Sequence, residues 1–200
     1  MQILKDEINE KILKAAKTFF LDIGFEKASM SMIAKEAGVS KSNLYNYFSS
    51  KEEIFYALTE EAYIQINNTM ENLLRHDSED CFQLEKFTAL MTKELIVLLT
   101  KYREEILLIL DRSIGTKFEN AKEEIIHRLE KHMKWEFKQY HITLENEDWF
   151  FAHYISTSLI EGLLEIIRHN QSDMWIQNNV KMLVGYYIYG YSYFFADSIS

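Results

Sequence analysis

Proline is absent from all 200 residues of the chain, and glycine occurs only six times. These two residues interrupt helices more strongly than any others, so their scarcity favours helix along most of the chain. In the first segment, the apolar residues Ile8, Ile12, Phe19 and Ile23 recur at helical spacing, and Gly24 stands where a left-handed residue would end that helix. The sequence therefore predicts an all-α fold.

Short polar or glycine-bearing breaks divide the chain into about nine predicted helices. We expect three short helices first and six longer ones after them, the fourth beginning at Lys51 and the last running from about Met174 to Asp197. This pattern predicts two domains, residues 1–50 and residues 51–200. The predicted breaks lie near residues 26–29, 38–40, 49–50, 76–80, 100–103, 113–117, 140–147 and 169–173.

The net charge of the chain is −9, which by itself argues against a nucleic-acid partner. The distribution of charge matters more, because the segment from Lys27 to Lys51 carries four lysines and one acidic residue. The lone cysteine, Cys81, has no disulfide partner in the chain, and the longest uncharged stretch, from Met182 to Ala196, is too short to span a bilayer. We therefore expect a cytoplasmic protein, without a secretory signal, whose basic segment lies near the N-terminus.

Residues 29–55 have the spacing of a helix-turn-helix. Such a unit needs a small residue where its helices cross, a glycine in the turn and an apolar residue that fixes the second helix, and Ala34, Gly38 and Leu44 supply them. Ser29 and Ser40 are placed to cap the two helices. The predicted inward-facing residues of this three-helix unit are Ile33, Ala37, Val39, Leu44 and Phe48, together with Phe19, Phe20 and Ile23.

A second helix beginning at Lys41 would expose a set of polar and aromatic residues suited to DNA. Lysine, serine and tyrosine donate to phosphate oxygens, and asparagine can pair with adenine in the major groove. Ser50 and Glu53 form a predicted capping box, which places Lys51 on the first turn of the fourth helix. The outward-facing residues would be Lys41, Ser42, Asn43, Tyr45, Asn46 and Tyr47.

This region resembles the DNA-binding region of the TetR family. The resemblance covers residues 8–58 and is carried by Gly24-Phe25, Ser29, Ile33-Ala34, Ala37 to Lys41, Leu44-Tyr45, Tyr47-Phe48 and Ser50 to Phe55. It implies an all-helical homodimer that binds a palindromic operator, with a ligand pocket and the dimer interface in the C-terminal helices. The DNA contacts that it implies are Ser31, Ser40, Lys41, Ser42, Asn43, Tyr45, Tyr47 and Lys51.

Two positions depart from the common pattern of the family, which has glycine more often at Ser42 and histidine more often at Tyr47. Tyr45 and Tyr47 lie about 200° apart on a helix, so one of them could face the core instead of DNA. Arginine is absent from the first sixty residues, which removes the bidentate reading of guanine by arginine there. The operator sequence therefore stays open.

Beyond Lys51 the chain is rich in aromatic residues and methionine, as expected of a bundle with an apolar pocket. Most of these residues are expected to belong to the hydrophobic core, as such residues usually do. No cofactor is expected, and the stripe Glu161, Glu165 and His169 suits a solvated face better than a metal site. The candidate ligand-binding residues are Met91, Leu95, Asp111, Arg112, Trp135, Trp149, His153 and Thr157.

The last two predicted helices, near residues 147–168 and 174–197, are the candidate dimer interface, because the second is apolar nearly all round. Together these features predict a DNA-binding transcriptional regulator that a small-molecule effector of unknown identity releases from its operator, repression being the commoner behaviour in the family. The chain lacks a nucleophile motif and a phosphate-binding glycine loop, so we predict that it is not an enzyme. Two other readings stay open: a helical small-molecule carrier or interaction module without DNA binding, and a metal-dependent helical enzyme.

Overall fold

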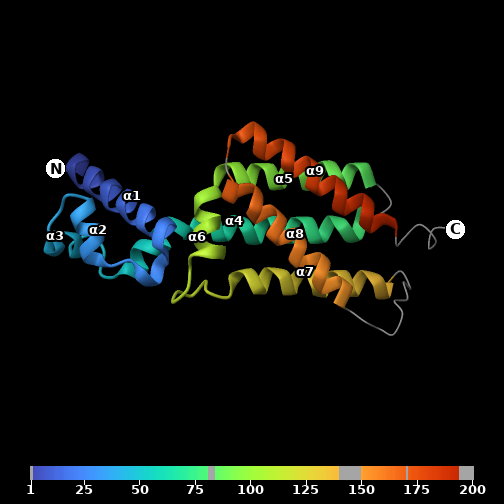
Figure 1. Cartoon of the computed structure of the whole chain (residues 1–200), viewed down its shortest axis with the longest axis horizontal. Helices are drawn as coiled ribbons and strands as arrows, with labels where there is room; N and C mark the ends of the chain where they lie inside the picture. The colour runs from blue at the N-terminus through green and yellow to red at the C-terminus, as the bar shows by residue number, and fades with distance from the viewer. Residues whose placement is uncertain (1, 81–83, 140–149, 170, 194–200) are drawn as a thin grey trace. The chain divides into compact units, whose positions relative to one another are not determined.

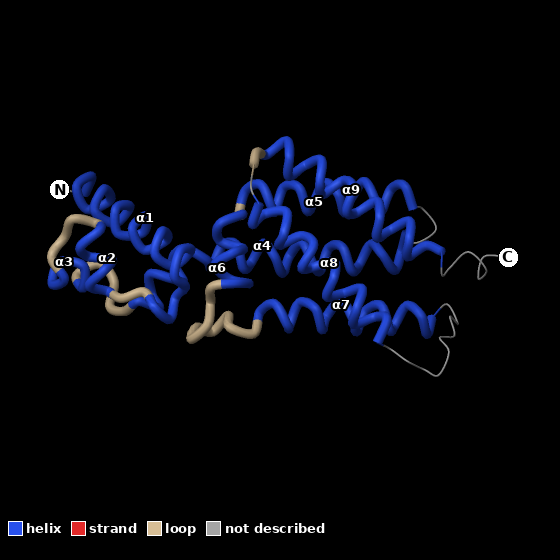
Figure 2. Tube along the Cα trace, in the orientation of Figure 1, coloured by secondary structure: helices blue, strands red, loops and turns tan. Residues whose placement is uncertain are grey.

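The computed structural model describes residues 2–80, 84–139, 150–169 and 171–193, and within these ranges it has nine helices and no strand (Figures 1 and 2). The all-α prediction is therefore confirmed. The helices are α1 (Gln2–Lys27), α2 (Met30–Glu36), α3 (Lys41–Tyr45), α4 (Lys51–Asp80), α5 (Leu84–Lys101), α6 (Arg103–Asp111), α7 (Ala121–Gln139), α8 (Phe150–His169) and α9 (Asp173–Ser192).

Most predicted helix boundaries agree with the structure, and two do not. α4 begins at Lys51, and α1 is interrupted at Gly24, whose φ of 82° is in the range that glycine tolerates. α1 is nevertheless 26 residues long, not short, and α4 continues through the predicted break at 76–80. That break rested on polarity alone, because residues 76–80 hold neither glycine nor proline. The predicted break at 140–147 and the predicted end at Asp197 lie outside the described residues.

The chain forms two compact units. The first consists of Met1–Ile64 and Glu104–Lys122, and the second of Gln65–Arg103 and Glu123–Ser200. The long helix α4 contributes residues to both units. The predicted domain boundary between residues 50 and 51 therefore does not coincide with the boundary between the two packed units. The division of the chain into a DNA-binding part and a ligand-binding part stays a prediction.

Four buried phenylalanines form the core of the first unit. The ring of Phe55, on α4, has its centroid 5.3 Å from that of Phe20 and 5.2 Å from that of Phe25, both on α1. Phe118, in the segment between α6 and α7, lies 6.4 Å from Phe55. Aromatic pairs at these separations add stabilisation beyond the burial of their surface. The cluster therefore holds α1, the first turns of α4 and the segment after α6 together.

Polar contacts reinforce the same junction. The amide of Phe25 donates to the carbonyl of Arg112, with 3.0 Å between the two atoms. The ammonium of Lys17 lies 3.0 Å from a carboxylate oxygen of Glu104 and 2.8 Å from one of Glu105. Burial alone lowers the pKa of Lys17, but the hydrogen bonds to Glu105 and Glu104 outweigh burial and raise it. These contacts attach α6 to α1 within the first unit.

The second unit is a helical bundle in which α9 packs along α5 and also against α8 (Figure 1). Gly162 permits the close approach of α8 to α9, because a Cβ atom there would lie 3.1 Å from the side chain of Leu183. Among the described residues, α8 alone is long and apolar enough to cross a membrane by length and composition. It buries Ile160, Leu164 and Ile167 in the bundle, and the core helix of a globular unit has the same composition.

Replacement of Phe55 by alanine tests the role of the aromatic cluster. Phe55→Ala removes a fully buried ring and should lower the free energy of unfolding by about 3 to 5 kcal/mol, measured by urea denaturation. Ile64→Ala removes an exposed side chain from the same helix and should change it by no more than about 0.5 kcal/mol. Equal losses in the two variants would show that the cluster does not hold this unit together.

Candidate functional site

The helix-turn-helix predicted from the sequence is present with its caps. The Ser29 hydroxyl accepts the amide of Met32 at 3.3 Å, and the Ser40 hydroxyl accepts the amide of Asn43 at 3.0 Å. Gly38 has a φ of 68°, which lets the chain turn between α2 and α3. The geometry of the motif is therefore set by three local sequence signals.

The inner side of this motif is mostly as predicted. Ile33, Leu44 and Phe48 are buried, and so is Ala34 at the crossing of the two helices, while Ala37 and Val39 are half-buried. On α1, however, the buried stripe runs through Ile12, Ala16 and Phe20. Phe20 is buried and Phe19 half-buried, but the placement of Ile23 on the inward side was wrong, because Ile23 is exposed at the edge of that stripe.

The outer side carries the polar residues predicted to contact DNA, here called the recognition surface. Ser31, Ser40, Lys41, Ser42 and Asn46 are exposed, and Asn43 and Tyr47 are half-buried. The side chain of Tyr45 is 46% exposed. Neither tyrosine is a buried core residue, and a phosphate contact by either hydroxyl stays a prediction. The recognition surface is complete as a set of hydrogen-bonding groups on α2, α3 and the residues beside them.

Lys51 has a structural role that was not predicted from the sequence. Its ammonium donates to the carbonyls of Phe25, Glu26 and Ala28 at 2.6, 3.3 and 2.8 Å, and it lies 4.1 Å from the centroid of the Phe25 ring. Burial lowers its pKa, although Glu52 and Glu26 oppose this. A lysine ammonium has three donors, and here each has a carbonyl acceptor. A phosphate contact by Lys51 stays a prediction, and it would compete with these bonds.

The predicted capping box at the start of α4 forms only in part. The Ser50 hydroxyl accepts the amide of Glu53 at 3.2 Å, as expected. The Glu53 carboxylate does not return to Ser50 and instead accepts the amide and the hydroxyl of Ser49 at 2.6 and 2.7 Å. These two bonds hold the pKa of Glu53 below its usual value. The cap therefore also fixes the turn that precedes α4.

The second unit contains a cavity of about 110 Å³ between its helices. Its wall is mostly apolar, with three polar side chains, His132 and Glu136 on α7 and Ser156 on α8. The apolar residues that line it are Leu73, Leu74, Phe87, Met91, Leu129, Met133, Ile155, Leu159 and Ile188, and the phenol of Tyr187 also belongs to the wall.

Of the predicted ligand-binding residues that the structure describes, only Met91 lines this cavity. Leu95 is buried elsewhere in the bundle, and Trp135 is exposed. His153 is also exposed, and its ring nitrogen lies 3.2 Å from the Glu130 carboxylate. Thr157 is half-buried and does not line the cavity.

Three further candidates cannot be assigned to this cavity. Asp111 and Arg112 belong to the first compact unit, because α6 packs with α1 there, so they do not line a cavity of the second. Trp149 lies outside the described residues. A ligand contact by any of these three residues stays a prediction.

His132, Glu136 and Ser156 were not predicted as site residues, although the sequence of α7 carries a signal for two of them. Ile125, Leu129, His132 and Glu136 fall at helical spacing, so the last two continue an apolar stripe with ionisable residues. In the structure, the His132 Nε2 atom lies 3.8 Å from a Glu136 carboxylate oxygen, and Glu136 is only 2% exposed. A charged residue within an apolar helical stripe is the sequence feature that indicates a buried polar group.

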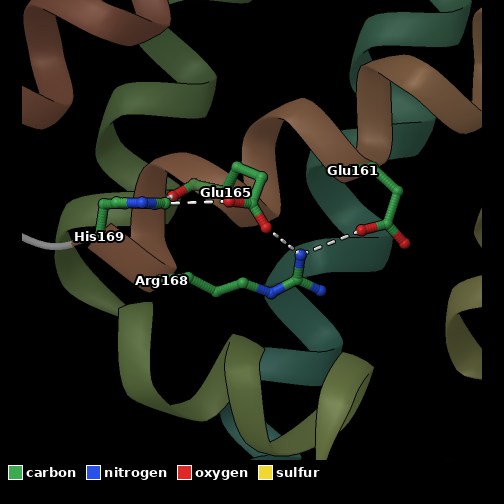
Figure 3. A network of polar contacts seen from close by, with 4 residues as sticks. All are labelled: Glu161, Glu165, Arg168 and His169. Carbon is green, nitrogen blue, oxygen red and sulfur yellow. Dashed lines mark hydrogen bonds and ion pairs between the residues drawn. The ribbon is translucent and has the colours of Figure 1, made fainter.

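The stripe of Glu161, Glu165 and His169 is a surface ion-pair network (Figure 3). The Arg168 guanidinium lies 3.1 Å from a Glu161 carboxylate oxygen and 2.6 Å from one of Glu165. His169 pairs with Glu165 through both the backbone carbonyl and the carboxylate. Arg168 therefore takes the place between the carboxylates that a metal ion would need. Within the described ranges, no group of three metal-ligating side chains is arranged around one point.

Replacing Lys51 separates its structural role from DNA binding. Lys51→Ala leaves three carbonyls near the end of α1 without their cation, so the free energy of unfolding should fall by about 1 to 3 kcal/mol in urea denaturation without DNA. Lys41→Ala removes an exposed lysine and should change it by no more than about 0.5 kcal/mol. If Lys51→Ala unfolds like the wild-type chain, the carbonyl contacts contribute nothing to stability.

Comparison with known proteins agrees with this geometry. Residues 12–58 match the model of the family described as bacterial regulatory proteins, tetR family. The HTH-type transcriptional regulator YfiR of Bacillus subtilis is 45% identical over 56 residues, 28% of this chain and 27% of that protein. The HTH-type transcriptional activator FasR of Mycolicibacterium smegmatis is 46% identical over 54 residues, 27% of this chain and 25% of that protein. The chain thus spans about a quarter of the length of these curated relatives.

Solved structures resemble the chain over most of its length. NalD, the secondary repressor of the MexAB-OprM multidrug efflux pump in Pseudomonas aeruginosa, aligns over 93% of this chain and 96% of its own, with a TM-score of 0.53 and 20% identity. SmeT in its triclosan complex aligns over 92% and 90%, with a TM-score of 0.56 and 19% identity. On these matches, residues 12–58 are similar to the DNA-binding region of the TetR family of bacterial regulatory proteins, and the fold of the chain is similar to that of these two solved structures.

Proposed function

We propose that the chain is a transcriptional repressor that binds a palindromic DNA operator as a homodimer and is released by a small-molecule effector. The observation that carries this proposal is the recognition surface, in which hydrogen-bonding side chains cover the outer side of a capped helix-turn-helix that matches the TetR family. Such a regulator acts on DNA in the cytoplasm, which agrees with the expected location.

Electrostatics support DNA binding at this surface and not elsewhere. Lys27, Lys35 and Lys41 are exposed, whereas Glu36 is the only acidic residue between Lys27 and Lys51. The acidic charge of the chain belongs mainly to residues 61–200, which would repel a duplex. In a two-fold dimer, the two α3 helices would enter successive major grooves about 34 to 36 Å apart.

The exposed face of α9 supports the dimer. Met182, Tyr186 and Tyr189 on α9, and Tyr193 directly after it, fall at helical spacing, and all four are exposed in the single chain, Tyr186 to 76%. A contiguous stripe of large apolar side chains on one helix is typical of an interface, because water solvates it poorly. A second copy would cover the stripe through a self-complementary contact of α8 and α9.

The cavity of the second unit supports effector binding. It is mostly apolar and has a few polar groups, which is the usual make-up of a small-molecule site. Leu73 and Leu74 of its wall belong to α4, the same helix that carries Phe55 and Lys51 in the first unit. A ligand that shifts α4 at the cavity would therefore change how α3 is presented to DNA, provided that it binds the two arrangements with different affinity.

DNA binding is tested with duplex from the region upstream of the chain's own gene. Wild-type protein should bind it, and the affinity should fall steeply between about 50 and 200 mM salt. Lys41→Ala should weaken binding and reduce the slope of log K against log salt by about 2 in the dimer, one phosphate being lost per protomer. Lys131→Ala, which removes an exposed lysine of α7, should bind as tightly as wild type. Absence of binding even at low salt would favour the small-molecule carrier.

The dimer is tested by analytical ultracentrifugation. Tyr186→Glu places a charge within the exposed stripe of α9 and should shift the protein from dimer to monomer at micromolar concentration, because two such carboxylates would be buried together. Ile114→Glu adds the same charge at an exposed apolar residue of the first unit and should leave the dimer intact. A monomeric wild-type chain, or an unchanged dimer in Tyr186→Glu, would contradict this interface.

A further inference from the structure

The cavity of the second unit has the size of a small ring. An apolar protein cavity of about 150 Å³ stays dry and accepts benzene. At about 110 Å³, this cavity has room for one ring or a short chain, and its apolar side chains come from α4, α5, α7, α8 and α9. Met91 and Met133 belong to its wall, and methionine side chains adapt readily to the shape of a ligand. The cavity therefore suits a small molecule that is mostly apolar.

The ionisable groups of the wall already have partners within the protein. The His132 Nε2 atom lies 3.8 Å from a Glu136 carboxylate oxygen, and both residues also have further interactions within the chain. Lysine and arginine do not occur among the described residues that line the cavity. A charged ligand would lose its hydration on entry, and burial of a charge is costly unless a free counter-charge accompanies it. The wall therefore favours a ligand without charge.

Ser156 is the polar group of the wall that lacks a partner. Its side chain is 1% exposed, and its hydroxyl has no hydrogen-bond partner among the described residues. By contrast, the buried hydroxyl of Ser113 has the carbonyl oxygens of Ile109 and Phe118 at 2.7 and 3.0 Å. A buried hydroxyl without a partner is unfavourable, so such groups usually have a ligand or a water molecule as their partner. Because Ser156 lines the cavity, its partner would lie there.

We propose that the effector is a small neutral hydroxyl compound, an alcohol or a phenol. Its hydroxyl group forms a hydrogen bond with the Ser156 hydroxyl, which can both donate and accept, and its ring or short chain fills the apolar part of the cavity. A hydrocarbon of the same shape would leave Ser156 without a partner, and an ion would leave its own charge without one. This inference rests on the proposed function, which makes the cavity the effector site.

Calorimetric titration of the full chain tests the proposal with benzyl alcohol and ethylbenzene, which have nearly the same shape and differ in the hydroxyl group. Ser156→Ala should lose about three- to tenfold in affinity for benzyl alcohol, as expected for one neutral hydrogen bond, and should bind ethylbenzene at least as tightly as wild type. Ser158→Ala removes a hydroxyl of α8 that bonds to the carbonyl of Ile155 and does not line the cavity, so it should bind both probes like wild type.

Two charged probes of similar size test the preference for a neutral ligand. Benzylamine is a cation and benzoate an anion at neutral pH, and each should bind wild type at least about tenfold more weakly than benzyl alcohol, because its charge would be buried without a free counter-charge. Binding of either ion as tightly as benzyl alcohol would overturn the inference. So would equal losses of benzyl alcohol and ethylbenzene in Ser156→Ala, unchanged benzyl alcohol affinity in that variant, or no binding of benzyl alcohol at millimolar concentration.

The unpartnered hydroxyl also predicts a difference in stability that needs no ligand. Ser156→Ala should unfold at a urea concentration at least as high as wild type, because no hydrogen bond within the protein is lost. Ser113→Ala loses a bonded hydroxyl and should unfold at a lower concentration. Equal decreases in the two variants would show that the protein already satisfies Ser156, which would refute the assigned ligand class.

Operator affinity of the ligand-free protein is measured separately, so that the two proposals can fail independently. Absence of operator binding would sink the proposed function, whereas a loss of benzyl alcohol affinity confined to Ser156→Ala would still support the assigned ligand class. Operator binding together with unchanged benzyl alcohol affinity in Ser156→Ala would refute the ligand class alone.

Discussion

The packing of Phe55 against Phe20, Phe25 and Phe118 is the interaction on which the first unit depends. It joins three segments that are far apart in sequence, α1, the start of α4 and the loop after α6, around one buried ring. Lys51 stabilises the same junction, because its ammonium lies over the Phe25 ring and donates hydrogen bonds to backbone carbonyls near the end of α1. Within the first unit, these contacts hold the start of α4 against the end of α1, next to the helix-turn-helix.

Local signals predicted the first unit well. Cap residues, a turn glycine and helical spacing act within a few residues of one another, so Ser29, Gly38 and Ser40 could be assigned from the sequence alone. Contacts between residues that are far apart in the sequence could not be predicted in this way. Nothing near Phe118 indicates that residues 104–122 pack with α1, and nothing near Lys51 indicates that its ammonium reaches back to Phe25. Ile23 was misplaced because helical periodicity defines a stripe but not its centre.

The second unit was predicted as a bundle, but the wall of its cavity was not. A cavity depends on which faces of five helices meet, and the sequence gives only the face of each helix that is apolar. Among the predicted ligand residues within the described ranges, Met91 alone lines it, whereas Glu136 and Ser156 supply its most buried polar groups. Their burial could be expected only once α7 and α8 were known to face one another. Charge inside an apolar stripe, as at His132 and Glu136, is the local sign of such a site.

The central claim is that duplex DNA lies on the recognition surface. Site-specific photocrosslinking measures this most directly, with a photoreactive residue at position 42, on α3, and in a second protein at position 97, an exposed site of α5. We expect crosslinks to operator DNA from position 42 that disappear as salt is raised, and none from position 97. Crosslinks from position 97, or none from position 42 at low salt, would contradict it.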